Sequence, residues 1–142
     1  MHVMNNIKRV LVTLALSAGT ASYAEVVVIV SPKSPISVLS VEQASDVFLN
    51  GLPLLGGSQA APIDQTEGSP IRDEFYAKVV NKSPAQLKAY WCKVIFTGKG
   101  RPPKEAPDSA TIKKLVTDNS TAIGYIEKGA VDASVKVVLT VR

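Results

Sequence analysis

The polar residues best suited to binding chemistry lie in one short segment, residues 65–73 (QTEGSPIRD). Gly68 permits a tight turn, and Ser69 followed by proline is typical of a helix N-cap and first helical position. The N–H groups of Ile71 and Arg72 would then face the positive end of the helix dipole, which favours anions. The Ser69 hydroxyl and, if its side chain folds back, the Arg72 charge would complete an oxyanion site. The alternative is an ordinary capped helix with a solvated arginine.

A second set of hydrogen-bond donors follows the β-branched run EVVVIV of residues 25–30. Ser31, Ser34 and the N–H of Ile36 lie after this predicted strand, and open α/β sheets bind ligands at the carboxyl ends of their strands. These residues are therefore further ligand-binding candidates. The alternative is a connector stiffened by Pro32 and its neighbouring proline.

Three cations, Lys99, Arg101 and Lys104, lie in a loop rich in glycine and proline. This cluster is either a patch for an anion or partner, or a solvated loop without a function.

Several kinds of chemistry are excluded by residue types. The single histidine, His2, lies in the leader described below, so the remaining chain has no imidazole for acid–base catalysis or metal binding. Cys92 is the one cysteine, and its place in a helical pattern beside Trp91 predicts a buried, inert thiol. We therefore expect no enzyme activity, no metal and no cofactor.

The first 24 residues have the pattern of a secretory signal peptide. Lys8 and Arg9 precede an apolar run over residues 10–18, and Ser22 and Ala24 put small residues at the −3 and −1 positions of a cleavage site. The alternative is an N-terminal anchor or a core helix. Cleavage would leave residues 25–142 in the periplasm, without a membrane span. That part has 14 basic and 12 acidic residues, a net charge of +2, which gives no case for nucleic acid binding.

The elements that must position these residues alternate between strands and helices. Capping boxes begin at Ser40 and Ser83, and a further helix begins at Asp108 or Ser109. Apolar spacing predicts inward-facing side chains on each helix. These are Val41, Ala44 and Phe48; Ile71, Phe75 and Val79; Leu87, Trp91, Val94 and Ile95; and Ile112, Leu115 and Val116. Strands are expected at 25–30, 61–64, 122–126 and 134–142, the last with alternating inward valines and leucine. The whole predicts one three-layer α/β domain, a mixed sheet flanked by helices.

Four segments resemble the phosphate-binding, PstS-like branch of the periplasmic binding protein superfamily. They are SVEQASDVFLNG, EGSPIRDEF, SPAQLKAYWCKVIFTGKGRPPKE and TAIGYIEKG, which occur in family order between residues 26 and 130. The resemblance is closest to short single-domain phosphate ABC transporter substrate-binding proteins. The family's anion loop, Arg-x-Asp-Gly-Ser-Gly-Thr, matches residues 65–71, where Glu67, Gly68 and Ser69 fit and Gln65 replaces the arginine.

The resemblance implies a single periplasmic-binding-protein-like lobe that binds phosphate or a similar oxyanion for an ABC permease. Residues 31, 34, 67–69, 71 and 72 are the candidate ligand-binding positions. Because three donors of the family loop are replaced and two full lobes would need a longer chain, a second hypothesis stays open. It is a ligand-free interaction or regulatory module that retains the fold.

Cleavage after Ala24 should give a mature protein whose first residue is Glu25. N-terminal sequencing of the periplasmic fraction tests this. An intact Met1 in that fraction would show that the leader is retained.

Overall fold

The computed structural model describes residues 25–50, 54–55 and 58–142. The predicted signal peptide, the helix end at Gly51 and the glycine pair Gly56–Gly57 lie outside these described residues. In the described part, no helix is both long and apolar enough to cross a membrane.

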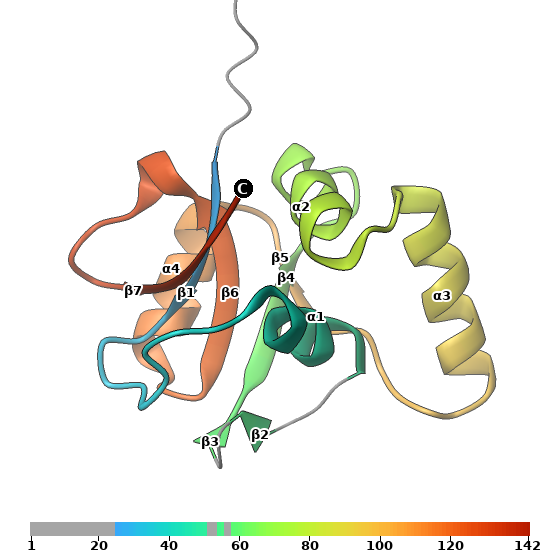
Figure 1. The fold of residues 1–142 in the computed structure, drawn as a ribbon, viewed down its shortest axis with the longest axis horizontal. Helices are drawn as coiled ribbons and strands as arrows, with labels where there is room; N and C mark the ends of the chain where they lie inside the picture. The colour runs from blue at the N-terminus through green and yellow to red at the C-terminus, as the bar shows by residue number, and fades with distance from the viewer. Residues whose placement is uncertain (1–24, 51–53, 56–57) are drawn as a thin grey trace, which may run out of the picture.

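A mixed sheet of five strands, in the order β5-β4-β6-β1-β7, forms the middle of the domain (Figure 1). A separate two-stranded sheet pairs β2 with β3. The strands are β1 (Val26–Val30), β2 (Leu54–Leu55), β3 (Ser58–Gln59), β4 (Ala61–Gln65), β5 (Lys104–Ala106), β6 (Ala122–Glu127) and β7 (Lys136–Val141). The predicted α/β class with a mixed sheet is therefore confirmed.

Strand directions divide the sheet into two parts. β4 runs parallel to both β5 and β6, whereas β1 runs antiparallel to both β6 and β7. Val30, at the end of β1, consequently pairs with Ile123 near the start of β6. All five residues of β1 are buried, as expected for a β-branched strand covered on both faces.

Helices cover both faces of the sheet (Figure 1). The helices are α1 (Val41–Asn50), α2 (Pro70–Phe75), α3 (Pro84–Phe96) and α4 (Ser109–Asp118), with a π-helical segment η1 (Tyr76–Val80) and a 3-10 turn η2 (Lys128–Ala130). α4 lies behind the sheet and packs Ile112 and Val116 against Val27 and Ile29. α1, α2 and η1 lie on the other face, and α3 lies at the outer margin. The three-layer arrangement follows from these two apolar faces.

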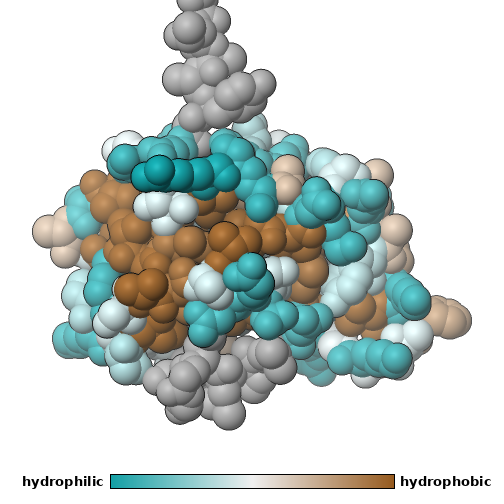
Figure 2. Space-filling model, in the orientation of Figure 1, coloured by the Kyte–Doolittle hydropathy of each residue, from teal (hydrophilic) through white to brown (hydrophobic). Residues whose placement is uncertain are grey.

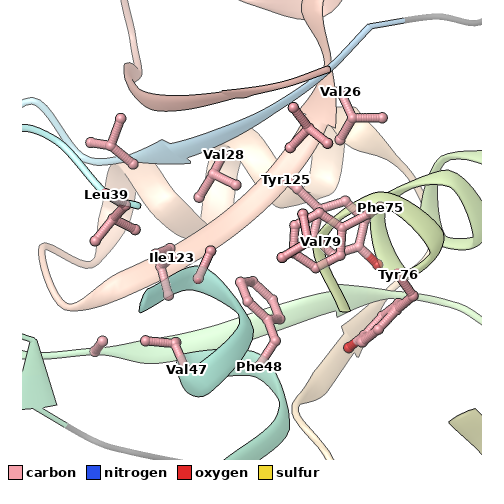
Figure 3. Close-up of a cluster of buried hydrophobic side chains, with 14 of the residues drawn as sticks. Val26, Val28, Leu39, Val47, Phe48, Phe75, Tyr76, Val79, Ile123 and Tyr125 are labelled. Atoms are coloured by element: carbon pink, nitrogen blue, oxygen red, sulfur yellow. The ribbon is translucent and has the colours of Figure 1, made fainter. Parts of the chain in front are cut away.

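Aromatic rings fill the larger of the two cores, which Figure 3 shows. Phe75 stacks on Tyr125 with ring centroids 4.0 Å apart, and Phe48 meets the edge of Phe75 at 4.9 Å. These contacts join α1, α2 and β6. Figure 2 shows hydrophobic residues at the surface in the middle of one face of the domain, with hydrophilic residues mostly around them.

The predicted helix starts are confirmed in detail. Ser40 and Gln43 exchange hydrogen bonds at the start of α1, and Ser83 and Gln86 do so at the start of α3. Asp108 caps α4 by accepting from the N–H of Thr111 at 2.8 Å. Each of these caps joins two residues that lie three positions apart in the sequence, so tertiary packing has little influence on it.

Three predictions of burial are wrong. Val41 is 40% exposed and Ile95 is 57% exposed, because each lies at the edge of the apolar stripe of its helix. Cys92 is exposed rather than buried. It follows Trp91 by one residue, about 100° around the helix, and so points away from the core side of α3.

Two predictions for strands need correction. The segment 97–107, expected to be loop throughout, contains β5, whose three residues pair with β4. In β7 the expected alternation fails because the pairing with β1 slips between Val28 and Ile29. Val138 is the extra residue of this irregularity and is buried, whereas Val137 is 37% exposed.

Trp91 and Leu87 are buried as predicted, with 7% and 3% exposure. Trp91→Ala should therefore cost about 3 kcal/mol in the free energy of unfolding, through lost burial and a residual cavity. Phe96, also on α3 but 92% exposed, is the matched control, and Phe96→Ala should change stability by less than about 0.5 kcal/mol. Urea unfolding measures both, and equal losses would contradict the packing of α3 described here.

Candidate functional site

The carboxyl ends of β4, β5 and β6 meet at one edge of the sheet because these strands are parallel. β4 ends at Gln65, and the next residue, Thr66, donates its N–H to the Ala106 carbonyl at the end of β5, at 3.1 Å. Tyr125 of β6 reaches the same place, since its hydroxyl accepts the N–H of Gln65 at 3.1 Å. The edge therefore brings together residues that lie far apart in the sequence.

The turn between β4 and α2 has the form predicted from the sequence. Ser69 donates its N–H to the Thr66 carbonyl at 3.1 Å, and Gly68 has φ +91°, a conformation that favours glycine. The Ser69 hydroxyl oxygen caps α2 by accepting the N–H of Arg72 at 3.4 Å. Glu67 and Gly68 are exposed, and Ser69 and Ile71 are half-buried. The structure thus places four of the predicted residues around one helix start.

Gln65 fixes this turn in place. Its side-chain oxygen accepts the Ser69 hydroxyl proton at 2.8 Å. Its side-chain nitrogen donates to the Ser109 hydroxyl and the Tyr125 carbonyl, both at 3.3 Å. The Ser69 hydroxyl is consequently engaged both as donor and as acceptor within the protein.

Arg72 is neither solvated nor free to add charge to the turn. It is 9% exposed, and its Nη1 donates to the Gln65 carbonyl and to Glu105 Oε1, both at 2.9 Å. The same nitrogen lies 3.8 Å from Asp64 Oδ2. The side chain does fold back, as the oxyanion hypothesis requires, but two carboxylates balance its charge.

Asp64 is the polar residue that the sequence analysis missed. Its side chain is 2% exposed, and it accepts hydrogen bonds from the Tyr76 hydroxyl at 2.7 Å and from the Tyr125 hydroxyl. The only hint in the sequence was an acidic residue directly after the apolar residues API of the predicted strand. A carboxylate buried at this depth needs donors, so the two tyrosines and Arg72 form a connected polar cluster around it.

Burial governs the ionisation of this cluster. Burial raises the pKa of Asp64 above its ordinary value, and this effect outweighs the opposing hydrogen bonds from Tyr125 and Tyr76 and the charge of Arg72. The pKa of each tyrosine is also raised, first by burial and then by the neighbouring Asp64. Both hydroxyls therefore stay protonated and remain donors.

A cavity of about 180 Å³ lies beside the cluster, between α2, α3 and the segment before β5. Leu87, Trp91 and Pro102 are among its apolar lining residues. Its charged lining residues are the carboxylates Glu67, Asp73 and Glu105 and the cations Arg72 and Lys88. The carboxylates outnumber the cations, so this cavity does not attract anions by its charge.

Ser31 and Ser34 are not brought to this site. β1 runs antiparallel to β6, so its carboxyl end lies at the opposite edge of the sheet. There the Ser31 hydroxyl oxygen accepts the N–H of Lys33, and that of Ser34 accepts the N–H of Ile36, both at 3.2 Å. Both serines are buried and hold the shape of their own loop. Their place at the carboxyl end of β1 therefore does not bring them to the edge where β4, β5 and β6 end.

Among residues 25–50, 54–55 and 58–142, no three His, Cys, Asp or Glu side chains are grouped so that they could hold an ion. Asp64 and Glu105 instead share Arg72.

No protein-family model matches the chain, and no curated protein matches it. Solved structures do resemble it. One is named as a phosphate ABC transporter substrate-binding protein with bound phosphate from Clostridium perfringens, with 24% identity and a TM-score of 0.64. Another is an ABC-type phosphate transport receptor from Vibrio cholerae, with 21% identity and a TM-score of 0.64. A third is PstS from Borrelia burgdorferi, with 14% identity and a TM-score of 0.58.

Each match covers 80% of this chain but only 44%, 45% and 46% of the respective structure. The chain therefore spans less than half the length of the proteins that it resembles. At these identities the likeness concerns the fold, and it confirms the predicted periplasmic-binding-protein-like architecture.

Protonation of Asp64 should make the stability of the domain depend on pH. Folding raises the pKa of Asp64 above its ordinary value of 3.8. Protonation of Asp64 therefore stabilises the folded state relative to the unfolded chain. This contribution is fully present below the pKa of the unfolded chain and is lost as the pH rises through the folded-state pKa. Urea unfolding of wild type and Asp64→Asn at a series of pH values from about 4 upward measures it.

We expect the free energy of unfolding of wild type to fall relative to that of Asp64→Asn as the pH rises through this window. The exposed residue Asp118 provides a matched control, because Asp118→Asn should follow the wild-type profile. Parallel profiles for wild type and Asp64→Asn would show that Asp64 does not titrate differently on folding.

Proposed function

We propose that this chain is a periplasmic solute-binding lobe that receives phosphate or a similar oxyanion and serves an ABC-type uptake system. The observation that carries the proposal is the turn of residues 66–69, which presents a helix start at the carboxyl edge of three parallel strands. Ligands of open α/β sheets bind at that edge, and helix starts bind anions. The names of the structural neighbours, one of them with bound phosphate, agree with it.

Backbone groups rather than a free cation would hold the ion. Arg72 is paired with Glu105 and lies close to Asp64, so it contributes little net charge to the turn. The proposed contacts are the N–H groups of Gly68 and Ile71. The Ser69 hydroxyl would join them if it gave up its hydrogen bond to Gln65 and donated to the ligand instead. This arrangement supports weak binding, because the surrounding carboxylates oppose an anion.

A second candidate function is an interaction or regulatory module that has kept the fold without the ligand. Two observations favour it. The polar side chains of the turn are bonded to one another, as in the Ser69–Gln65 and Arg72–Glu105 pairs. The chain also spans less than half of each structural neighbour. The neighbours are named as transport proteins rather than enzymes, and neither candidate function involves catalysis.

Arg72 is a poor residue for testing the site, because Arg72→Gln would leave two carboxylates unpaired and destabilise the fold. Ser69→Ala would remove the helix cap at a cost of about 0.5–2 kcal/mol. Glu67 is the better choice, since it is exposed and lies in the turn itself. Glu67→Gln removes one negative charge without removing a buried partner.

We expect Glu67→Gln to bind phosphate about two- to fivefold more tightly than wild type, the effect of one exposed charge. Calorimetry of the mature protein with phosphate, sulfate, molybdate and tungstate measures this, and urea unfolding checks that stability is unchanged. Glu42→Gln, at an exposed position of α1, is the matched control and should bind as wild type does. If neither wild type nor Glu67→Gln binds any of the four anions at millimolar concentration, the interaction module replaces the transport proposal.

A further inference from the structure

The end of α3 and the loop after it carry a concentrated positive charge. Residues 88–104 contain five cations and no carboxylate: Lys88, Lys93, Lys99, Arg101 and Lys104. Residues 25–142 have 14 basic and 12 acidic residues. With the five cations set apart, the rest therefore has nine basic and 12 acidic residues, a charge of −3. The net positive charge of residues 25–142 therefore comes from this segment, most of which belongs to α3 and the loop after it, at one margin of the domain in Figure 1.

The same segment presents two exposed hydrophobic side chains that are adjacent in the sequence. Phe96 is 92% exposed and Ile95 is 57% exposed. They are the last two residues of α3, so they project beside the cationic loop. An aromatic side chain left in water at the tip of a basic segment contributes little to the stability of the fold.

The backbone holds this arrangement firmly. After Phe96 the chain reverses at Gly98, which has φ +66°. Gly98 donates its N–H to the Ile95 carbonyl and Lys99 donates to the Val94 carbonyl, both at 3.1 Å. This pair of bonds is the Schellman ending of a helix, and it directs the loop back along α3.

Three of these cations, one on α3 and two in the loop, line one groove. Lys93, Lys99 and Arg101 line a depression of about 350 Å³ together with Tyr90 and Trp91. Its lining residues within the described chain include no Asp or Glu. A groove with cationic and aromatic lining accommodates an anionic headgroup.

We propose that this basic tip, residues 93–104, docks the domain on an anionic phospholipid surface, with Phe96 and Ile95 inserted into the headgroup region. Amphipathic surfaces of this kind bind through buried apolar area together with attraction of Lys and Arg to anionic lipid. The two exposed apolar side chains suffice for shallow insertion but form only a small part of the roughly 800 Å² per partner that a stable protein interface needs.

A second copy of the chain fits the basic tip poorly. In a two-fold symmetric dimer the same patch would face itself, and the four cations of the tip in each copy would repel those of the other. The proposal does not depend on oxyanion binding at the turn of residues 66–69, although Glu67 of that turn lines the same cavity as Ile95 and Pro102.

Co-sedimentation with vesicles tests the proposal. We expect the protein of residues 25–142 to bind vesicles that contain phosphatidylglycerol and not vesicles of phosphatidylcholine alone. Binding should weaken strongly between about 0.1 M and about 1 M salt, since salt screens the attraction. A polarity-sensitive dye on Cys92, the one cysteine of the chain and exposed on α3, should shift to the blue on the anionic vesicles.

The variants separate charge from insertion. The double variant Lys99→Gln/Arg101→Gln should bind about 25-fold more weakly, at about fivefold per charge. Phe96→Ser should bind about tenfold more weakly through lost apolar burial. The matched controls are the exposed residues Lys33 and Lys114 for charge and Val38, 78% exposed, for apolar surface. Lys33→Gln/Lys114→Gln and Val38→Ser should bind as wild type does.

Three results would overturn the proposal. One is absence of binding to phosphatidylglycerol vesicles by the folded wild type. Another is equal loss of binding in the control and tip variants, which would show that overall charge is responsible. The last is concentration-dependent self-association, seen by sedimentation in solution, that Phe96→Ser abolishes, which would assign the tip to a contact between copies. Loss of phosphate binding with retained vesicle binding would count against the oxyanion site alone.

Discussion

The buried Asp64 carboxylate makes the strongest demand on the rest of the structure. Removing such a group from water is costly unless donors surround it. Here the donors come from η1 and β6, through Tyr76 and Tyr125, and the balancing charge comes from Arg72 of α2. The stacked rings of Phe75 and Tyr125 then pack beside these polar contacts. Its polar contacts therefore connect β4, α2, η1 and β6, in addition to the pairing of β4 with β6 and the aromatic packing.

The same demand decides what the neighbouring turn can do. Arg72 is the one guanidinium at the turn that links β4 to α2, and its charge is shared between Asp64 and Glu105. The turn therefore retains the backbone geometry of an anion-binding helix start but has little free positive charge. In this respect the polar cluster, which stabilises the domain, works against tight capture of an oxyanion.

Features of this structure that depend on residues close together in the sequence could be predicted from it, and features that depend on residues far apart in the sequence could not. The caps at Ser40, Ser69 and Ser83 were predicted correctly because each involves residues within one helical turn. The location of Ser31 at the wrong edge of the sheet could not be predicted, since the direction of β1 depends on pairing with β6, about a hundred residues later. Asp64 was missed for the same reason, because its partners Tyr76 and Tyr125 become neighbours only in the folded chain. The register shift in the pairing of β1 with β7 likewise has no recognisable pattern in the sequence of either strand.

The position of β1 also determines how the nascent chain must behave. Of the five strands of the mixed sheet, β1 comes first in the sequence, but it lies between β6 and β7, which come last of the five. Until residues 122–141 are available, its five valine and isoleucine residues have neither edge paired. Such a segment is prone to pair with other chains until its partner strands are available. Pairing between strands that lie about a hundred residues apart also slows folding.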